Sequence, residues 1–262
     1  MESKIHPIGV RAKCMKIIPL SEGAFTIDKT KKFVPFNKEE DDLQQRTTGS
    51  LLVEVQPFCI VTKRDVIVID TGLGFTNKEG HLQIHQNLLN NGINPMDVTK
   101  VLLSHLHKDH SGAISVEDKI LHQHFISFPN ANYYVNKDEL VFALDKTNTS
   151  YNQSDFEILA NADKVIFTQG NGIIDGYIRY EVTGAHCPFH QVFWIEEDGL
   201  KVFFGGDVAP QLQQMKSRFI AKYDFDGKKC MELRQQWWQI GQEQKWTFLF
   251  YHDIKTPLFN FE

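Results

Sequence analysis

The chain has 262 residues, a formal net charge of −5 and a sequence pI near 6.1. This balance argues against a nucleic-acid partner, because nucleic-acid-binding domains usually carry a basic face. No stretch of about 18 apolar residues is present, so we expect no membrane span. No long apolar run follows the N-terminal charges, as it would in a signal peptide. The four cysteines are far apart and form no C-x-x-C pair, which indicates reduced thiols in a cytoplasmic protein.

The N-terminal part of the chain is predicted to form strands separated by one long polar segment. Residues 8–18 mix apolar and basic side chains and predict a first strand. Residues 19–50 are polar and irregular, and we interpret them as a surface insertion or lid, with a solvated loop as the alternative. Residues 51–62 predict a strand pair or a bent strand with Pro57 at the bend. Residues 65–70 predict a short buried strand.

Helices and strands alternate along the rest of the chain. Residues 81–91 place apolar side chains on one helical face, and Gly92 is a plausible C-terminal stop. Asn136 is expected to cap a helix that begins at Lys137, with Glu139 reaching back as in a capping box. Further strands are expected at 101–103, 132–135, 165–168, 177–183, 191–195, 200–204 and 246–251, and further helices at 153–162, 211–221 and 228–242. This mixture predicts two sheets packed face to face with helices outside them.

Residues 101–113 read Val-Leu-Leu-Ser-His-Leu-His-Lys-Asp-His-Ser-Gly-Ala and hold a dense group of metal-binding residue types. Imidazoles and carboxylates suit zinc and its first-row neighbours. Residues two apart in an extended segment point to the same side, so His105 and His107 can hold one ion. Asp109 and His110 follow where a glycine suggests a turn, and could face a second ion. The alternative is a polar loop rich in histidine, but the pattern should arise by chance with a probability of only about 10⁻³.

This H-x-H-x-D-H pattern resembles the signature of the metallo-β-lactamase superfamily, and the other sequence elements of that family are present in family order. The resemblance extends from about residue 50 to residue 253. The first additional element is an Asp-x-Gly that begins at Asp70, and the second is a histidine after a strand, His186. The others are Asp207, which follows a strand and two glycines, and His252, which follows the last strand.

The resemblance implies an α/β fold, the four-layer αββα sandwich, with the site at one edge where strands of both sheets end. The motif residues lie between Asp70 and His252, so one site draws on nearly the whole chain. This spread favours a single domain over residues 1–262, with the lid or insertion at 19–50.

The resemblance also implies two divalent metal ions, with zinc expected first and iron or manganese as alternatives. The implied ligands are His105, His107 and His186 for metal one, Asp109, His110 and His252 for metal two, and Asp207 as the bridge. A hydroxide that bridges the ions would be the nucleophile, and Asp109 could move a proton to the leaving group. Asp109 and Asp207 are therefore the expected catalytic residues. Asp70 and Ser104 are expected to orient ligand imidazoles, and His190 to lie just outside the ligand set.

Within the superfamily, the Ser-His-Leu-His-x-Asp-His form is similar to acyl-homoserine lactonases and their organophosphate-hydrolysing relatives. Those lactonases carry a tyrosine three positions after the bridging aspartate, where this chain has Pro210. The expected function is therefore a lactonase-like, binuclear metal-dependent hydrolase of a small ester, lactone, thioester or phosphoester. The expected partner is this small-molecule substrate, and a homodimer is one option for the assembly. We expect substrate specificity to depend on residues 19–50 and 114–128.

Two other functions stay open at this stage. One is a mono-iron sulfur dioxygenase of the persulfide-oxidising branch, which would use a subset of the same histidines with Asp207. The other is a non-catalytic metal-binding protein, because a fold does not by itself determine a function. Metal analysis would separate the first option from a hydrolase, since it requires one iron rather than two zinc ions.

Overall fold

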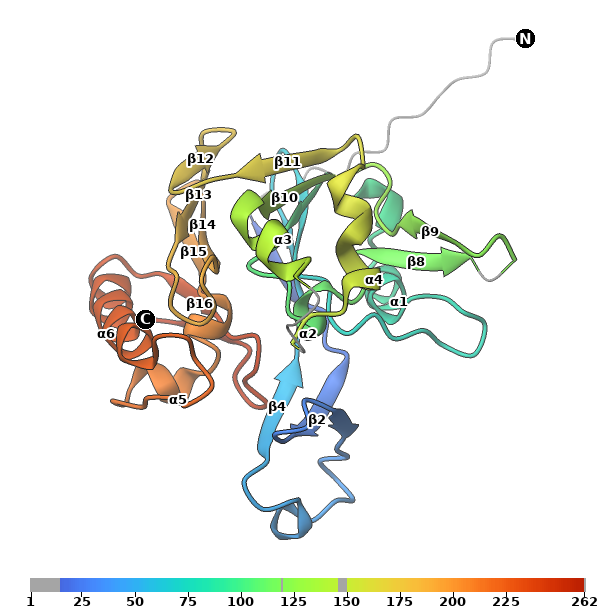
Figure 1. Ribbon diagram of the computed structural model, residues 1–262. Coiled ribbons are helices and arrows are strands. Elements are labelled where there is room, and N and C mark those ends of the chain that lie inside the picture. The colour runs from blue at the N-terminus through green and yellow to red at the C-terminus, as the bar shows by residue number, and fades with distance from the viewer. Residues whose placement is uncertain (1–14, 119, 146–149, 262) are drawn as a thin grey trace.

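Two six-stranded sheets form the centre of the computed structural model, which describes residues 15–118, 120–145 and 150–261 (Figure 1). The first sheet has the order β1 (Lys16–Pro19), β5 (Phe58–Val61), β6 (Val66–Ile69), β7 (Lys100–Leu102), β10 (Asn132–Asn136) and β11 (Val165–Thr168). The second has the order β12 (Gly172–Ile174), β13 (Ile178–Val182), β14 (Gln191–Glu197), β15 (Leu200–Phe204), β16 (Thr247–Leu249) and β17 (Leu258–Asn260). Each half of the chain thus builds one sheet.

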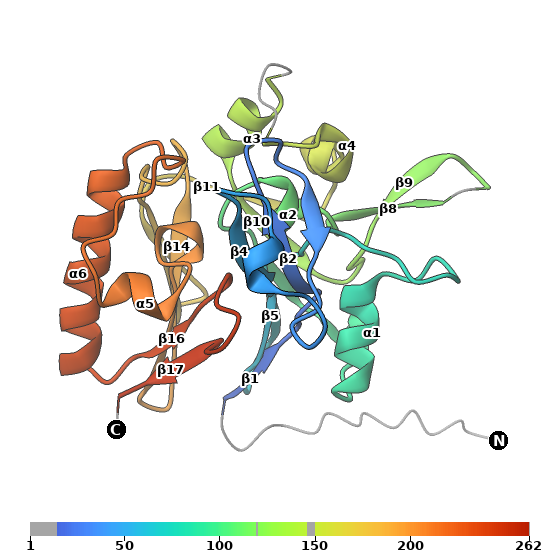
Figure 2. The same ribbon diagram turned by 90° about the horizontal axis from the view of Figure 1, so that it is seen from below.

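The helices cover the outer faces of these two sheets. They are α1 (Gln83–Asn90), α2 (Lys108–Ser111), α3 (Lys137–Ala143), α4 (Gln153–Phe156), α5 (Leu212–Met215) and α6 (Gly227–Glu243). Short 3₁₀ turns are η1 (Leu43–Gln45), η2 (Pro95–Asp97), η3 (Glu157–Ala160) and η4 (Gly206–Val208). Figure 2 shows α5 and α6 on one outer side and α1 and α4 on the other, with the sheets between them. This is the predicted four-layer αββα sandwich.

Buried apolar side chains join the layers. Phe58 and Phe193 belong to the cluster between the two sheets. Leu88 of α1 packs with Val101 of β7 behind the first sheet, and Trp237 of α6 packs behind the second. Burying a large apolar side chain stabilises a fold by about 1.5–3 kcal/mol. The ends of the strands are therefore held in place by packing on both faces of each sheet.

The prediction that residues 19–50 are irregular was wrong. They contain β2 (Gly23–Ile27) and β3 (Phe33–Pro35), which pair with β4 (Leu51–Val55) in a three-stranded sheet of order β3-β2-β4. In Figure 1 this sheet extends away from the sandwich. The long polar stretch between its strands hid the pairing, although Phe25 and Val53 lie opposite one another and are both buried.

Other segments also differ from the sequence predictions. Residues 114–128 form the hairpin of β8 (Ser115–Asp118) and β9 (Gln123–Ile126), which was not predicted, and neither was β17. The helix predicted at 211–221 is limited to α5, and the Phe219 carbonyl beyond its end accepts a hydrogen bond from the buried Arg234 guanidinium instead of a helical N–H. The Asn136 cap is present, but Glu139 does not complete a capping box and accepts from the backbone N–H of Leu106.

Part of the predicted first strand, residues 8–14, lies outside the described residues. The described part of the chain has no helix long and apolar enough to cross a membrane. The expected single domain over 1–262, the lid role of 19–50 and the homodimer stay predictions.

Candidate metal centre

The residues singled out by the sequence motif meet at one edge of the sandwich, each just after a strand. Asp70 follows β6, and the His105–His110 segment follows β7 and continues into α2. His186 lies between β13 and β14, Asp207 follows β15, and His252 follows β16. Strand ends from both sheets therefore supply the side chains of one site.

The seven side chains with metal-binding atoms form two neighbouring groups. One is His105, His107, His186 and Asp207, and the other is Asp109, His110 and His252, with the candidate ligand atoms of each group within 4.8 Å of one another. In the first, His186 Nε2 lies 3.1 Å from His107 Nδ1. In the second, Asp109 Oδ2 lies 3.5 Å from His252 Nε2. The structure thus brings together every residue that the resemblance implied as a ligand.

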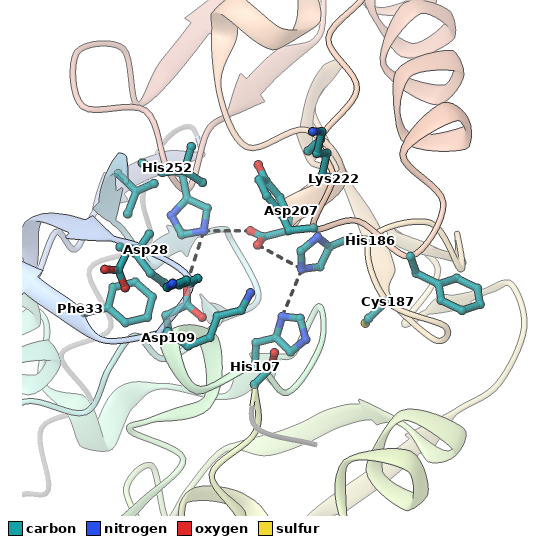
Figure 3. A pocket seen from close by; sticks show the side chains of 18 of the residues that line it. Asp28, Phe33, His107, Asp109, His186, Cys187, Asp207, Lys222 and His252 are labelled. Carbon is teal, nitrogen blue, oxygen red and sulfur yellow. Dashed lines mark hydrogen bonds and ion pairs between the residues drawn. The ribbon is translucent and has the colours of Figure 1, made fainter. Parts of the chain in front are cut away.

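Asp207 faces both groups with different oxygens (Figure 3). Its Oδ2 lies 3.3 Å from His186 Nε2, in the first group. Its Oδ1 lies 3.1 Å from His110 Nε2 and 3.0 Å from His252 Nε2, in the second group. A carboxylate placed in this way can give one oxygen to each of two adjacent cations.

Among the described residues, three buried atoms of these groups make no hydrogen bond of good geometry: His105 Nε2, His110 Nε2 and Asp207 Oδ1, although the last two lie 3.1 Å apart. Buried polar atoms in folded proteins almost always have a partner. Imidazole nitrogens and carboxylate oxygens that converge without one are the donor set of a divalent transition-metal site. The residues present therefore fit divalent metal ions.

The electrostatics of the site also fit cations. Burial, with the neighbouring imidazoles, lowers the pKa of His105 and His107 well below the usual value, so both rings are neutral and keep a free lone pair. Burial would raise the pKa of Asp207, but the nearby His252, His110 and His186 hold it well below the usual value. Asp207 outweighs burial and raises the pKa of His110 and His252, so in the metal-free protein these two rings hold protons that a metal ion would replace. The centre is thus a buried anionic carboxylate that stabilises positive charge around it.

Asp70 and Ser104 support two of the imidazoles, as their predicted role requires. Asp70 Oδ2 accepts a hydrogen bond from Ser104 Oγ and lies 2.7 Å from His110 Nδ1, while Oδ1 accepts from the Ser104 backbone N–H. Ser104 Oγ lies 3.0 Å from His105 Nδ1. One fully buried carboxylate therefore fixes His110 directly and His105 through a hydroxyl group, and such contacts hold a metal-binding ring in position.

His190 is buried beside the two ligand groups and outside both of them. Its Nε2 accepts a hydrogen bond from the backbone N–H of Asp207 at 3.2 Å. The side chain therefore holds the turn that carries Asp207, in the position that the sequence predicted for it.

The sequence analysis missed several residues that hold the ligands. The carboxylate of Asp224 lies 2.8 Å from His186 Nδ1 and its side chain is 2% exposed. The Glu54 carbonyl accepts from His252 Nδ1 at 2.7 Å. Tyr251 stacks on His110 with ring centroids 4.0 Å apart. No motif marks Asp224, whereas the position of Tyr251 directly before a candidate ligand was a usable signal.

A cavity of about 1010 Å³ leads to the two groups. Its walls come from the turn after β2, from β4, from the α3 region and from residues 219–225. Aromatic and aliphatic side chains predominate among the lining residues, which include Phe33, Leu51, Phe142, Phe219, Ile220 and Phe225. Residues of 19–50 line this cavity and no described residue of 114–128 does. The dependence of substrate specificity on these two segments stays a prediction.

The sequence model of the metallo-beta-lactamase superfamily matches residues 53–237, and the chain belongs to that superfamily. A search of curated proteins found no match. Among solved structures, a probable metal-dependent hydrolase from Staphylococcus aureus is similar, with a TM-score of 0.75 and 21% identity over 94% of this chain and 92% of that chain.

Two more solved structures share this fold. The hydrolase AbOPH of the beta-lactamase superfamily has a TM-score of 0.72 and 22% identity, over 95% of this chain and 90% of that chain. The dizinc quorum-quenching lactonase AidC, solved with a product, has a TM-score of 0.66 and 18% identity, over 93% and 89%. Identities at this level establish a common fold, and the chemistry of this chain must be argued from its own site.

Proposed function

We propose that this protein is a hydrolase that uses two divalent metal ions, zinc foremost, to cleave a small ester, lactone, thioester or phosphoester. The observation that carries the proposal is the placement of Asp207, whose two oxygens face two separate groups of ligand atoms. A site for a single ion would not need a carboxylate directed at both groups. One structural neighbour is a lactonase, and lactones therefore stay among the candidate substrates.

In the proposed site each ion has its own set of ligands. His105, His107 and His186 would hold the first ion, Asp109, His110 and His252 the second, and Asp207 both. Ions held there would lower the pKa of water toward neutrality and polarise the carbonyl or phosphoryl oxygen of a substrate. The apolar walls of the cavity would exclude bulk water, which strengthens electrostatic interactions at the site.

Asp109 is the candidate for proton transfer. Its carboxylate lines the cavity, and its side chain is 12% exposed, so a substrate can reach it. Tyr251 holds the segment in place by donating to the Asp109 carbonyl at 2.6 Å. Asp109 would take a proton at the reaction centre and give it to the leaving group, while its backbone stays fixed.

The seven donors in two groups favour a two-ion hydrolase over a mono-iron sulfur dioxygenase. Pro210, which stands where the lactonases have a tyrosine, accepts from the backbone N–H of His252 through its carbonyl and has no hydroxyl group to offer a substrate. A lactone substrate would therefore have to be oriented by other groups of the cavity.

The experiment is a hydrolysis screen of the zinc-loaded protein on a lactone, a thioester, a phosphodiester and a phosphotriester. Chelator-treated protein and the His107→Ala variant serve as controls. We expect turnover of at least one substrate class that disappears in both controls. A fully metal-loaded protein that hydrolyses none of them would support a non-catalytic metal-binding role instead.

A further inference from the structure

Two lysines from distant parts of the chain, Lys31 and Lys222, line the cavity that leads to the metal centre. Lys31 lies in the turn between β2 and β3, which also contributes Lys29 to the cavity wall, and Lys222 lies in the irregular segment before α6. In Figure 3, Asp28 and Phe33, which flank Lys31 in the sequence, lie on one side of His252, and Lys222 lies on the other side. Two cationic groups from distant parts of the chain thus border one entrance.

Neither ammonium group has a carboxylate within ion-pair distance in the described part of the chain. Several other lysines of this acidic protein, such as Lys38, Lys63 and Lys100, do pair with carboxylates. The one acidic residue among the cavity walls that is outside the ligand groups, Asp28, accepts hydrogen bonds from the backbone and hydroxyl of Thr30. Asp28 stays ionised, but the described walls outside the ligand groups carry three lysines, Lys29, Lys31 and Lys222, against this one carboxylate, which leaves a net positive charge at the entrance.

Apolar side chains in the same segment as Lys222 are unusually exposed. Phe225 is 69% exposed, Ile220 51% and Phe219 41%, and all three line the cavity. A patch of exposed apolar side chains beside a site commonly marks a surface that binds a ligand. One cavity thus combines exposed apolar side chains with cationic groups.

We infer that the substrate is amphiphilic: an acyl compound whose reacting carbonyl lies at the metal centre and whose apolar chain ends in an anionic group, a carboxylate or a phosphate. The chain would lie against Phe219 and Phe225, and the anionic end would bind Lys222 or Lys31. This inference rests on the proposed hydrolase function, which it narrows to anionic substrates. The local positive charge would also attract such substrates to an otherwise acidic protein.

The direct test compares aliphatic dicarboxylates with monocarboxylates of equal chain length, for example adipate with hexanoate, binding to the zinc-loaded protein in calorimetry. One carboxylate can occupy the metal centre in both probes, and only the dicarboxylate can also reach a lysine. We expect the best-fitting dicarboxylate to bind about two- to fivefold more tightly than its monocarboxylate, with a preference that declines as salt is added.

Charge-removing variants locate the effect. Lys222→Gln and Lys31→Gln should each reduce the preference, and the double variant should abolish it. Lys32→Gln is the matched control, because Lys32 neighbours Lys31 but does not line the cavity. Equal affinities for the two probes in the wild-type protein, or a preference that survives the double variant, would overturn the inference.

A hydrolysis arm separates this inference from the proposed function. The neutral ester 4-nitrophenyl hexanoate is compared with the 4-nitrophenyl monoester of adipate. We expect a higher kcat/KM for the anionic ester, with the difference lost in the double variant. If both esters are hydrolysed equally fast and adipate and hexanoate bind equally tightly, the preference for anionic substrates is contradicted, and the proposed hydrolase function still stands. Tight dicarboxylate binding without any turnover would contradict the hydrolase and support the anion site.

Discussion

The floor of the site, meaning the seven ligand side chains and the residues that hold them, differs from the entrance, meaning the cavity walls around Lys31 and residues 219–225. The two regions are built in opposite ways. On the floor, three ligand histidines use their second ring nitrogen to bind a fixed group: His110 binds Asp70, His186 binds Asp224, and His252 binds the Glu54 carbonyl. At the entrance, exposed aromatic side chains and lysines line the cavity without such partners among the described residues.

This difference separates two requirements of a hydrolytic site. Ligand atoms must hold their geometry before any ion or substrate arrives, and buried hydrogen bonds provide that rigidity. An entrance must accept a chain of variable position, and apolar side chains on loops can adjust to it. Substitutions on the floor should therefore change metal binding, and substitutions at the entrance should change substrate binding alone.

The largest effect is expected for Asp207→Asn. The amide keeps the shape of the side chain but removes the charge and one good ligand oxygen that the two groups share. We expect the variant to fold, to hold at most one ion tightly and to lose most of its hydrolytic activity, measured by metal analysis and by turnover of the substrate found in the screen. His190→Ala should lose less, because His190 lies outside both ligand groups.

A smaller loss is expected for Asp224→Asn, which keeps the size of the residue that orients His186. Removal of a group that orients a metal ligand typically weakens metal binding by about 10–100-fold. Competition with a chromophoric chelator would measure the zinc affinity. Asp226→Asn is a suitable control, because Asp226 accepts from the Lys229 backbone at the start of α6 and contacts no ligand. Unchanged zinc affinity in Asp224→Asn would show that His186 needs no such support.

Glu22 connects the entrance with the floor of the site. It directly precedes β2, and its carboxylate accepts a hydrogen bond from the backbone N–H of Leu73, in the loop after Asp70. Burial raises the pKa of Glu22 to about 7, although backbone N–H groups of Leu73 and its neighbours favour the ionised form. The folded state therefore binds this proton more tightly than the unfolded state, whose glutamate titrates near 4.5. The free energy of unfolding that Glu22 contributes should fall as the pH rises from about 4.5 to about 7.

The Glu22→Gln variant has no proton to lose at this position. Relative to the wild type it should gain stability across the same pH window and show a constant difference above it, measured by denaturant unfolding at a series of pH values. A difference between the two proteins that does not vary with pH would show that the pKa of Glu22 is the same in the folded and the unfolded state.

The smallest effect is expected for Phe225→Ala at the entrance. Phe225 is 69% exposed, so its loss leaves the fold and the metal centre in place. We expect an increase of a few-fold in KM for esters with long acyl chains, with zinc content and kcat close to wild type. Loss of zinc from this variant would contradict the separation between floor and entrance.

The floor could be predicted from the sequence and the entrance could not, for physical reasons. His105, His107, Asp109 and His110 lie within six positions after a buried strand, so local geometry already directs them to one place. Asp224 is held by a long-range contact that no local pattern reveals. Residues 216–221 were expected to continue a helix, but Arg234 binds the Phe219 carbonyl, and Phe219 and Ile220 line the cavity instead of a core.

The most direct test of the account is the number of zinc ions bound by the wild-type protein and by His110→Ala, determined by titration of the metal-free proteins. His110 belongs to the second ligand group, on the side of Asp207 Oδ1. The account predicts about two ions per chain for the wild type and one tightly held ion for His110→Ala, because the first group keeps all four of its ligands. A single ion in the wild type, or two ions held equally well after the substitution, would contradict a centre built from two groups joined by Asp207.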